Sequence, residues 1–207
     1  MWIWQSCTTT DQHNPKLVPV GFLPKELKEN SGLIEIAKDV YVGTNDSGHP
    51  AELYAFSLNQ QAGSRKITIE DATNQDWEEL TLDDQYVYIG DTGNNDGNRR
   101  DLCIYKVRRA DLINLNMVHA EKIAFTYPGQ TSFTSSSKNN FDCESMVCLG
   151  DSLYLFSKNR GNEKTDLYSL PKTPGTYQAI HRGQFNADGL VTGACIRNQG
   201  NQSQLVL

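Results

Sequence analysis

The sequence predicts an all-β protein of the β-propeller class, built from repeated units of short strands. Three segments of the 207-residue chain share one order of features, in which an apolar run, a polar loop and a second apolar run follow each other. The clearest copy spans residues 74–100, where a D-W-E motif precedes the apolar run Y-V-Y-I and the loop G-D-T-G-N-N-D-G. Propeller blades repeat about every 40–50 residues and are made of several short strands. A β-sandwich, the main alternative, does not repeat such a unit.

The repeats divide the chain into blades. We expect one propeller domain at residues 17–207, with four-stranded blades at about 31–70, 75–127 and 140–185 and part of a fourth at 190–207. Matched tyrosines support this division, with one set in the second strands and another in the third strands: Tyr41, Tyr88 and Tyr154, then Tyr54, Tyr105 and Tyr168. Because a closed propeller has about 4–8 blades, we expect the chain to be part of a longer propeller.

The segments between these landmarks are assigned from local composition. Residues 17–23 are apolar and predict a strand that completes a blade, which Pro19 restricts to a sheet edge. Residues 66–69 and 121–127 predict the outer strands of the first two blades. Residues 110–115 predict a short inserted helix and residues 130–140 a serine-rich surface loop. Residues 177–185 are expected to close the third blade.

The first 16 residues predict a disordered tether. Ser6 and Cys7 are followed by the polar run T-T-T-D-Q, an order that resembles the junction of a bacterial lipoprotein, where the cysteine is lipidated. This resemblance implies a bacterial cell-envelope or periplasmic protein with a lipid anchor at Cys7, and an ordinary disordered N-terminus is the alternative. No stretch approaches the roughly 20 apolar residues of a transmembrane helix.

Composition and missing motifs exclude several functions. The net charge is -6 and no run of lysine or arginine exceeds two residues, which argues against a nucleic-acid partner. The five cysteines include no C-x-x-C pair and no zinc-site spacing, so we expect them to be mostly buried apolar residues. Neither G-x-S-x-G nor H-E-x-x-H is present, so the common hydrolase signatures are missing.

Polar side chains are predicted to gather at one edge of the blades. Successive strands of a blade are antiparallel, so the start of the first strand and the end of the second lie at the same edge. The pairs Asp76 with Glu78 and Asp142 with Glu144 open two first strands, and each pair is spaced so that both side chains project to one side of an extended chain. Ionised carboxylates placed this close repel each other unless a positive group compensates them.

The residue types at this edge indicate a cation site. Calcium prefers carboxylate, amide and carbonyl oxygens, so a divalent cation, calcium in particular, is the expected cofactor. The expected metal ligands are Asn45, Asp46, Asp76, Glu78 and Asp91, and the expected ligand-binding residues are Asn94, Asn95, Arg99, Lys158 and Arg160. Two alternatives remain: the carboxylates accept hydrogen bonds from loop amides, or Arg99, Arg100, Lys158 and Arg160 neutralise them.

At these residues the chain resembles bacterial propellers of the gluconolactonase-like and phytase-like families. The resemblance covers residue 30 to about residue 194 and is carried by the D-W-E motif and the D-x-G-N-N loop. It implies a divalent cation at the mouth of the central channel, with Glu78 or Glu144, Asn45 and Asp91 as the matching ligand types. The first blade departs from the pattern, because S-G-L stands where D-x-E is expected.

Two functions from different classes follow as hypotheses. The first is a metal-dependent hydrolase of lactone or ester substrates, in which Asp142 or Glu144 acts as the base on a bound water. The second is a non-catalytic module that uses the same face to bind a small molecule or a protein.

Overall fold

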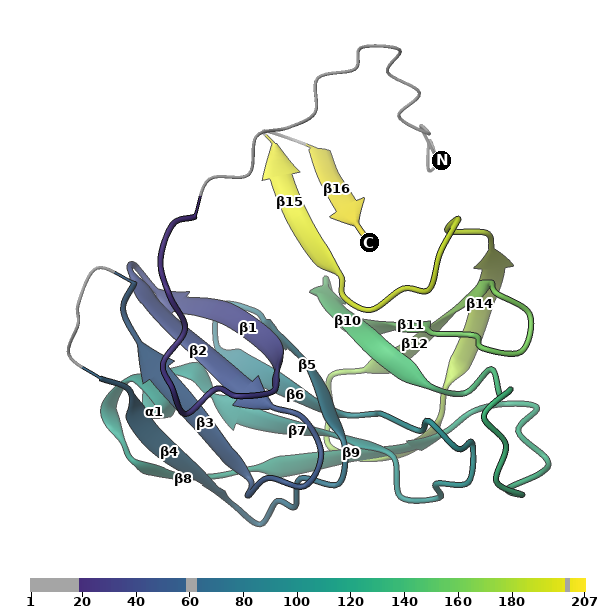
Figure 1. The fold of residues 1–207 in the computed structure, drawn as a ribbon, viewed down its shortest axis with the longest axis horizontal. Helices are drawn as coiled ribbons and strands as arrows, with labels where there is room; N and C mark the ends of the chain where they lie inside the picture. The colour runs from purple at the N-terminus through teal and green to yellow at the C-terminus, as the bar shows by residue number, and fades with distance from the viewer. Residues whose placement is uncertain (1–18, 59–62, 200–201) are drawn as a thin grey trace.

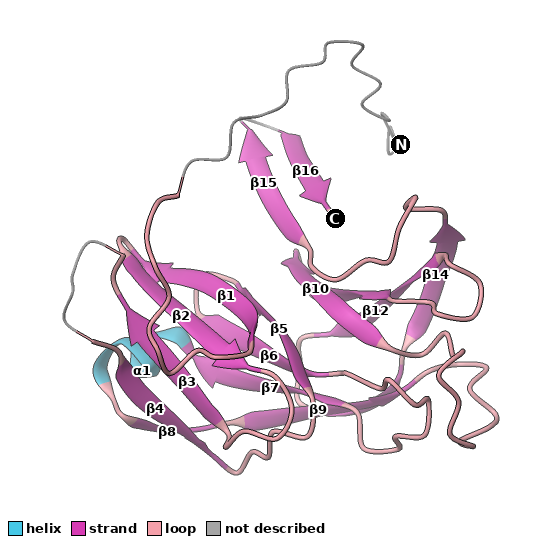
Figure 2. Ribbon diagram, viewed as in Figure 1, coloured by secondary structure: helices cyan, strands magenta, loops and turns pink. Residues whose placement is uncertain are grey.

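The computed structural model describes residues 19–58, 63–199 and 202–207, and their regular structure is almost entirely β-strand (Figure 1). Figure 2 shows one short helix beside the strands, α1 (Arg109–Asn114), which occupies the predicted insertion. The strands form four sheets in chain order. Residues 1–16, including Cys7 and the predicted tether, lie outside the described residues.

Each sheet takes most of its strands from one repeat. The first sheet contains β1 (Asn30–Ala37), β2 (Val40–Asn45), β3 (Glu52–Phe56), β4 (Arg65–Glu70) and β8 (Met117–His119). The second contains β5 (Trp77–Leu82), β6 (Tyr86–Asp91), β7 (Cys103–Arg108), β9 (Glu121–Thr126) and β13 (Gly175–Gln178). The third contains β10 (Cys143–Leu149), β11 (Ser152–Ser157), β12 (Thr165–Pro171) and β14 (Ile180–Phe185), and the fourth contains β15 (Cys195–Gln199) and β16 (Gln202–Val206).

Two short strands leave their own repeat and join the preceding sheet. Strand β8 follows α1 in the second repeat but pairs in parallel with β4, with Val118 opposite Ile69. Strand β13 belongs to the third repeat but pairs in parallel with β9, with Tyr177 opposite Phe125. The remaining strands of each sheet form antiparallel neighbours, so the parallel strands add a fifth strand to an antiparallel group of four.

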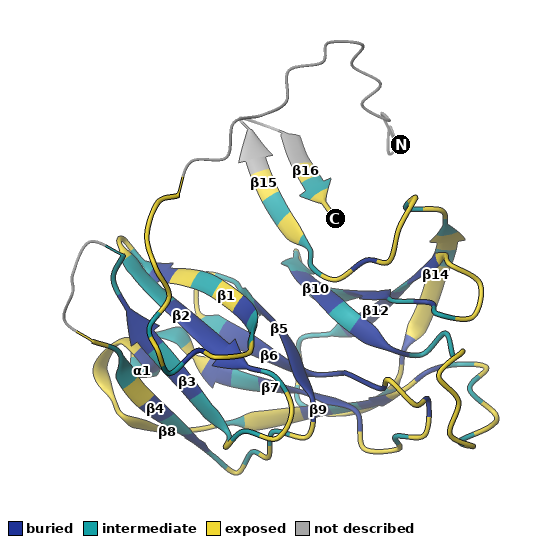
Figure 3. Cartoon of the chain, viewed as in Figure 1, coloured by how far each residue is buried: buried dark blue, intermediate teal, exposed yellow. Residues whose placement is uncertain are grey.

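The hydrophobic core lies between neighbouring sheets. Strand β5 contacts β1 on one side and β10 on the other, so the first strands of three sheets lie side by side (Figure 1). Trp77 is fully buried with Ile36 and Val42 between the first and second sheets, and Met146 and Leu155 are fully buried between the second and third. Figure 3 shows the same distribution, with buried residues in the inner strands and an exposed β14.

Strand register defines which tyrosines are equivalent. Tyr54, Tyr105 and Tyr168 lie opposite Gly43, Ile89 and Leu155 of the second strands, which makes the three tyrosines equivalent, as predicted. The same register places Tyr88 and Tyr154 at one position, immediately before Ile89 and Leu155. In the first sheet that position is taken by Val42, and Tyr41 lies one residue earlier. The predicted equivalence of Tyr41 is therefore wrong by one residue.

Two strand predictions need correction. The part of the 17–23 segment that is described forms no strand: Pro19 cannot donate a ladder hydrogen bond, and Val20 and Phe22 are 80% and 93% exposed. The segment 177–185, expected to close the third blade, does so only through β14, because Ala179 separates it from β13, which pairs with the second sheet.

Candidate metal centre

A β-bulge at the start of three first strands builds the centre. Asn30, Trp77 and Cys143 pair with the last residues of β2, β6 and β11, and the register then shifts by one residue in each sheet. The extra residues are Ser31, Glu78 and Glu144. A bulge redirects the side chain of its extra residue away from the normal alternation. All three side chains line one pocket of about 560 Å³.

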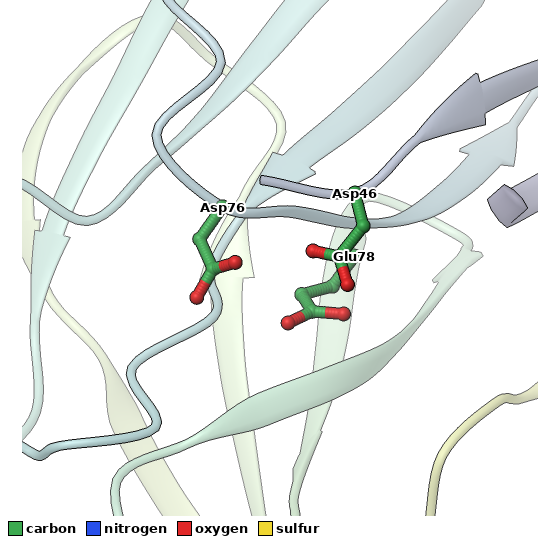
Figure 4. Close-up of side chains that lie close together, drawn as sticks. All are labelled: Asp46, Asp76 and Glu78. Carbon is green, nitrogen blue, oxygen red and sulfur yellow. The ribbon is translucent and has the colours of Figure 1, made fainter. Parts of the chain in front are cut away.

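Three carboxylates meet beside this pocket (Figure 4). Asp46 follows β2, Asp76 precedes β5, and Glu78 is the bulge residue of β5. One oxygen from each lies within 4.8 Å of the others, a group that could hold a metal ion. None of the three forms an ion pair with a described lysine, arginine or histidine, so their negative charge has no direct partner there.

Glu78 is the most isolated of these carboxylates. Its residue is 8% exposed, and no donor among the described residues makes a hydrogen bond to its carboxylate. Burial raises the pKa of Glu78 to about 9, and the neighbouring Glu144, Asp76 and Asp46 carboxylates act in the same direction. The pKa of Asp76 is also raised, by burial and by the adjacent Asp46. A bound cation would favour the ionised form of both groups.

Gly93 forms the wall against which two of these carboxylates pack. A Cβ atom at this position would overlap Asp76 Oδ2 and Glu78 Oε1. The Gly93 N–H also donates to the Asp76 carbonyl at 3.2 Å. The loop after β6 therefore holds both side chains in place and has no room for a larger residue at this point.

A second group of carboxylates shares Glu78. Oxygens of Glu78, Asp142 and Glu144 also lie within 4.8 Å of one another. Here cations are present, because Lys158 Nζ lies 2.5 Å from Glu144 Oε1 and Arg160 pairs with Asp142 at 3.0 Å and Glu144 at 3.3 Å. The second group is thus largely neutralised within the protein, whereas the first group is not.

Asn95 connects the two groups. Its Nδ2 lies 3.4 Å from Asp76 Oδ2, and its Oδ1 accepts from Arg160 at 2.5 Å. It lines the same pocket as Asp46, Glu144 and Lys158. The amide therefore faces the pocket between the unpaired carboxylates and the paired ones.

The two carboxylates predicted as a base differ in access. Asp142 is completely buried, and it accepts hydrogen bonds from the Asn94 N–H at 2.8 Å and from Arg160. Glu144 lines the pocket and has one oxygen, Oε2, with no donor among the described residues. Burial raises the pKa of Glu144, while Lys158 and Arg160 oppose that rise. Of the two, only Glu144 can reach a molecule in the pocket.

Four predicted site residues support the centre from outside it. Asp91 is 1% exposed, accepts from the Asp76 N–H at 3.0 Å and pairs with Arg99 at 2.9 Å. Burial raises the pKa of Asp91 and Arg99 opposes that rise. The Asn45 side chain bonds the backbone of Glu26 and Glu29, and Asn94 bonds the carbonyl of Phe141. These residues fix the loops that carry the acidic side chains.

Ser31 and Gly93 belong to the centre but were not predicted as site residues. Ser31 donates to the Trp77 carbonyl at 2.6 Å and occupies the bulge position of Glu78 and Glu144. Its position at the start of a first strand put Ser31 at the same edge as Asp76 and Glu78, but the lack of a D-x-E motif there left it out of the predicted ligands. Gly93 has no side chain that would indicate a site role in the sequence. Its role follows from the Asp76 and Glu78 carboxylates that pack against it.

Comparisons with known proteins do not identify a family. No protein-family model matches the sequence, and no curated protein matches it significantly. Within the described chain, no helix has the length and apolar character needed to cross a membrane. The assignment of function therefore rests on the geometry of the site.

Proposed function

We propose that this chain is a β-propeller protein whose acid-lined face binds one divalent cation. Three observations support the propeller: the sheets follow chain order, the first three are each built on four antiparallel strands, and the first strands of these three lie side by side. The observation that carries the cation is Glu78, a buried carboxylate without a hydrogen-bond donor among the described residues, directed at Asp46 and Asp76. Oxygen ligands of this kind suit a hard cation such as Ca²⁺.

More particularly, we propose a metal-dependent hydrolase of lactones or esters. When bound, the cation would polarise the substrate carbonyl and lower the pKa of a water molecule. Glu144 would accept one proton from that water while the hydroxyl oxygen bonds to the carbonyl carbon. The bond from that carbon to the leaving oxygen then breaks, and the leaving oxygen takes the proton back from Glu144. Asn95 and Lys158 line the pocket and would orient a polar substrate.

The second candidate function is a non-catalytic binding module. It is favoured by one observation, the contact between Glu144 Oε1 and Lys158 Nζ at 2.5 Å, because an ion-paired carboxylate is a weaker base. In this alternative the cation and the pocket hold a small molecule or a protein side chain without chemistry.

Turnover distinguishes the two functions. A panel of lactones, carboxylic esters and phosphate esters should be assayed with Ca²⁺ and with EDTA, using the wild type and Glu144→Gln. The hydrolase predicts turnover that EDTA removes and that Glu144→Gln lowers by about 10²-fold or more, the usual contribution of a general base. Glu163→Gln, an exposed change in the loop after β11, is the matched control and should retain activity. Calcium binding without turnover on any substrate would favour the binding module.

A further inference from the structure

Two cationic side chains contact the second acidic group. Glu144 Oε1 is contacted by both Lys158 Nζ and an Arg160 nitrogen. Lys158 is held at its backbone too, because its N–H donates to the Asp142 carbonyl at 2.8 Å. The lysine side chain is 14% exposed and lines the pocket, so the ammonium group lies against the Glu144 carboxylate and not in open solvent.

Glu78 makes the two groups a continuous site. It is the one residue common to both, and its carboxylate has no donor among the described residues. A carboxylate has two oxygens and about four lone-pair positions, so one glutamate can serve two neighbouring cations. In two-metal centres the ions lie about 3.5–4 Å apart, a separation that a shared carboxylate can span.

Charge explains why the protein would hold only one divalent cation. Five carboxylates surround the centre: Asp46, Asp76, Glu78, Asp142 and Glu144. When a bound cation keeps all five ionised, Lys158 and Arg160 neutralise two of them, so one divalent cation reduces the excess to a single negative charge and a second would make the centre positive. Without the lysine charge, two divalent cations would balance the site.

We propose that Glu78, Asp142 and Glu144 form a second cation position that the Lys158 ammonium group occupies in place of a metal ion. This inference rests on the proposed cation site at Asp46, Asp76 and Glu78. It predicts that neutralising Lys158 converts a one-cation centre into a two-cation centre, in which Glu78 lies between the ions.

The test is the stoichiometry of Mn²⁺ binding to the full chain, because Mn²⁺ accepts the same oxygen ligands and is visible by electron paramagnetic resonance. Calorimetry should give about one Mn²⁺ per chain for the wild type and about two for Lys158→Met. The variant should also show a spin-coupled spectrum at full occupancy. Lys158→Gln tests the same change with a polar side chain, and circular dichroism establishes that each variant is folded.

Two further variants control the result. Lys164→Met removes a lysine from the same loop that is exposed and has no ion pair among the described residues, and it should leave the stoichiometry at about one. Lys158→Met combined with Glu144→Gln should return it to about one.

The outcomes separate this inference from the proposed function. A wild type that binds no Mn²⁺ would refute the cation site itself. A wild type that binds one ion, with both Lys158 variants also binding one, would refute only the second position. A wild type that already binds two ions would likewise show that Lys158 does not occupy it.

Discussion

Replacing Glu78 with glutamine should remove calcium binding and stabilise the calcium-free protein. In the folded chain the pKa of Glu78 is raised from 4.5 to about 9 by burial and by neighbouring carboxylates. At pH 7 the carboxyl must stay protonated in the folded state although it ionises on unfolding, which costs about 3 kcal/mol of folding free energy. Glutamine has the same shape and no charge, so Glu78→Gln should recover up to about that amount.

Proton linkage determines how the stability of the calcium-free protein changes with pH. A carboxyl whose folded pKa lies above its unfolded value binds more protons in the folded state, so calcium-free stability falls as pH rises from about 4.5 to 9. Glu78→Gln should flatten that part of the curve. At a free calcium concentration of about 100 times the dissociation constant, binding should add about 2.7 kcal/mol to the wild type, or about 5–10 °C in melting temperature.

Thermal denaturation followed by circular dichroism, in calcium and in EDTA, measures both effects. The matched control is Glu79→Gln, because Glu79 is adjacent, also 8% exposed, and hydrogen-bonded to the Leu80 and Ala194 N–H groups rather than directed into the centre. It should retain the full calcium shift. The reasoning fails if Glu78→Gln retains that shift, or if the calcium-free variant is less stable than the wild type.

Three other perturbations test separate features. Gly93→Ala should abolish the rise in melting temperature caused by calcium, because the added methyl group displaces Asp76 and Glu78. Gly189→Ala is the control, since a methyl group there meets no atom within 4 Å and should leave that rise unchanged. Equal rises in both variants would argue against packing of Asp76 and Glu78 on Gly93. Burial alone would raise the pKa of Asp83, but the Lys172 ammonium, two backbone N–H groups and a tyrosine hydroxyl lower it to about 2. The ionised Asp83 therefore stabilises the folded protein above about pH 4, and this stabilisation is lost as pH falls towards 2. Lys172→Met should reduce this acid sensitivity in urea titrations at pH 2–5, and an unchanged pH profile would contradict the pairing. Leu155→Ala should cost about 2–5 kcal/mol in chemical denaturation because Leu155 is completely buried, and a loss below about 1 kcal/mol would mean that the core can collapse around it.

The sequence predicted the strand repeats and the edge at which polar side chains gather. Both depend on local patterns, because apolar runs form strands and antiparallel pairing brings strand ends together. It therefore placed Asp46, Asp76, Glu78, Asn95, Asp142 and Glu144 at one end of the sheets. These six residues do lie together in the structure.

Alternation along a strand explains only part of the geometry of the D-x-E motifs. Simple alternation accounts for two side chains on one side of a strand, but Glu78 and Glu144 are bulge residues, and a bulge depends on the register with the next strand. Tyr41 illustrates the same limit, since only ladder pairing shows that Val42 takes the place of Tyr88.

The roles of individual carboxylates could not be read from the sequence. Asp142 and Glu144 are both carboxylates and lie two positions apart in the sequence. Asp142 is buried beneath the Asn94 N–H and Arg160, whereas Glu144 lines the pocket. Asp91 was expected as a ligand, but its pairing with Arg99 directs it towards loop support. Such differences arise from contacts between loops far apart in the chain.

The parallel strands β8 and β13 have a consequence for how the protein unfolds. Repeat proteins whose units touch only through their faces tend to lose end units separately, because each unit keeps its own backbone hydrogen bonds. Here β8 completes the sheet of one repeat and β13 the sheet of another, so opening either repeat breaks ladder hydrogen bonds in its neighbour. Backbone hydrogen bonds of β8 and β13 therefore connect the first three sheets. We therefore expect their amides to exchange with solvent as one cooperative unit.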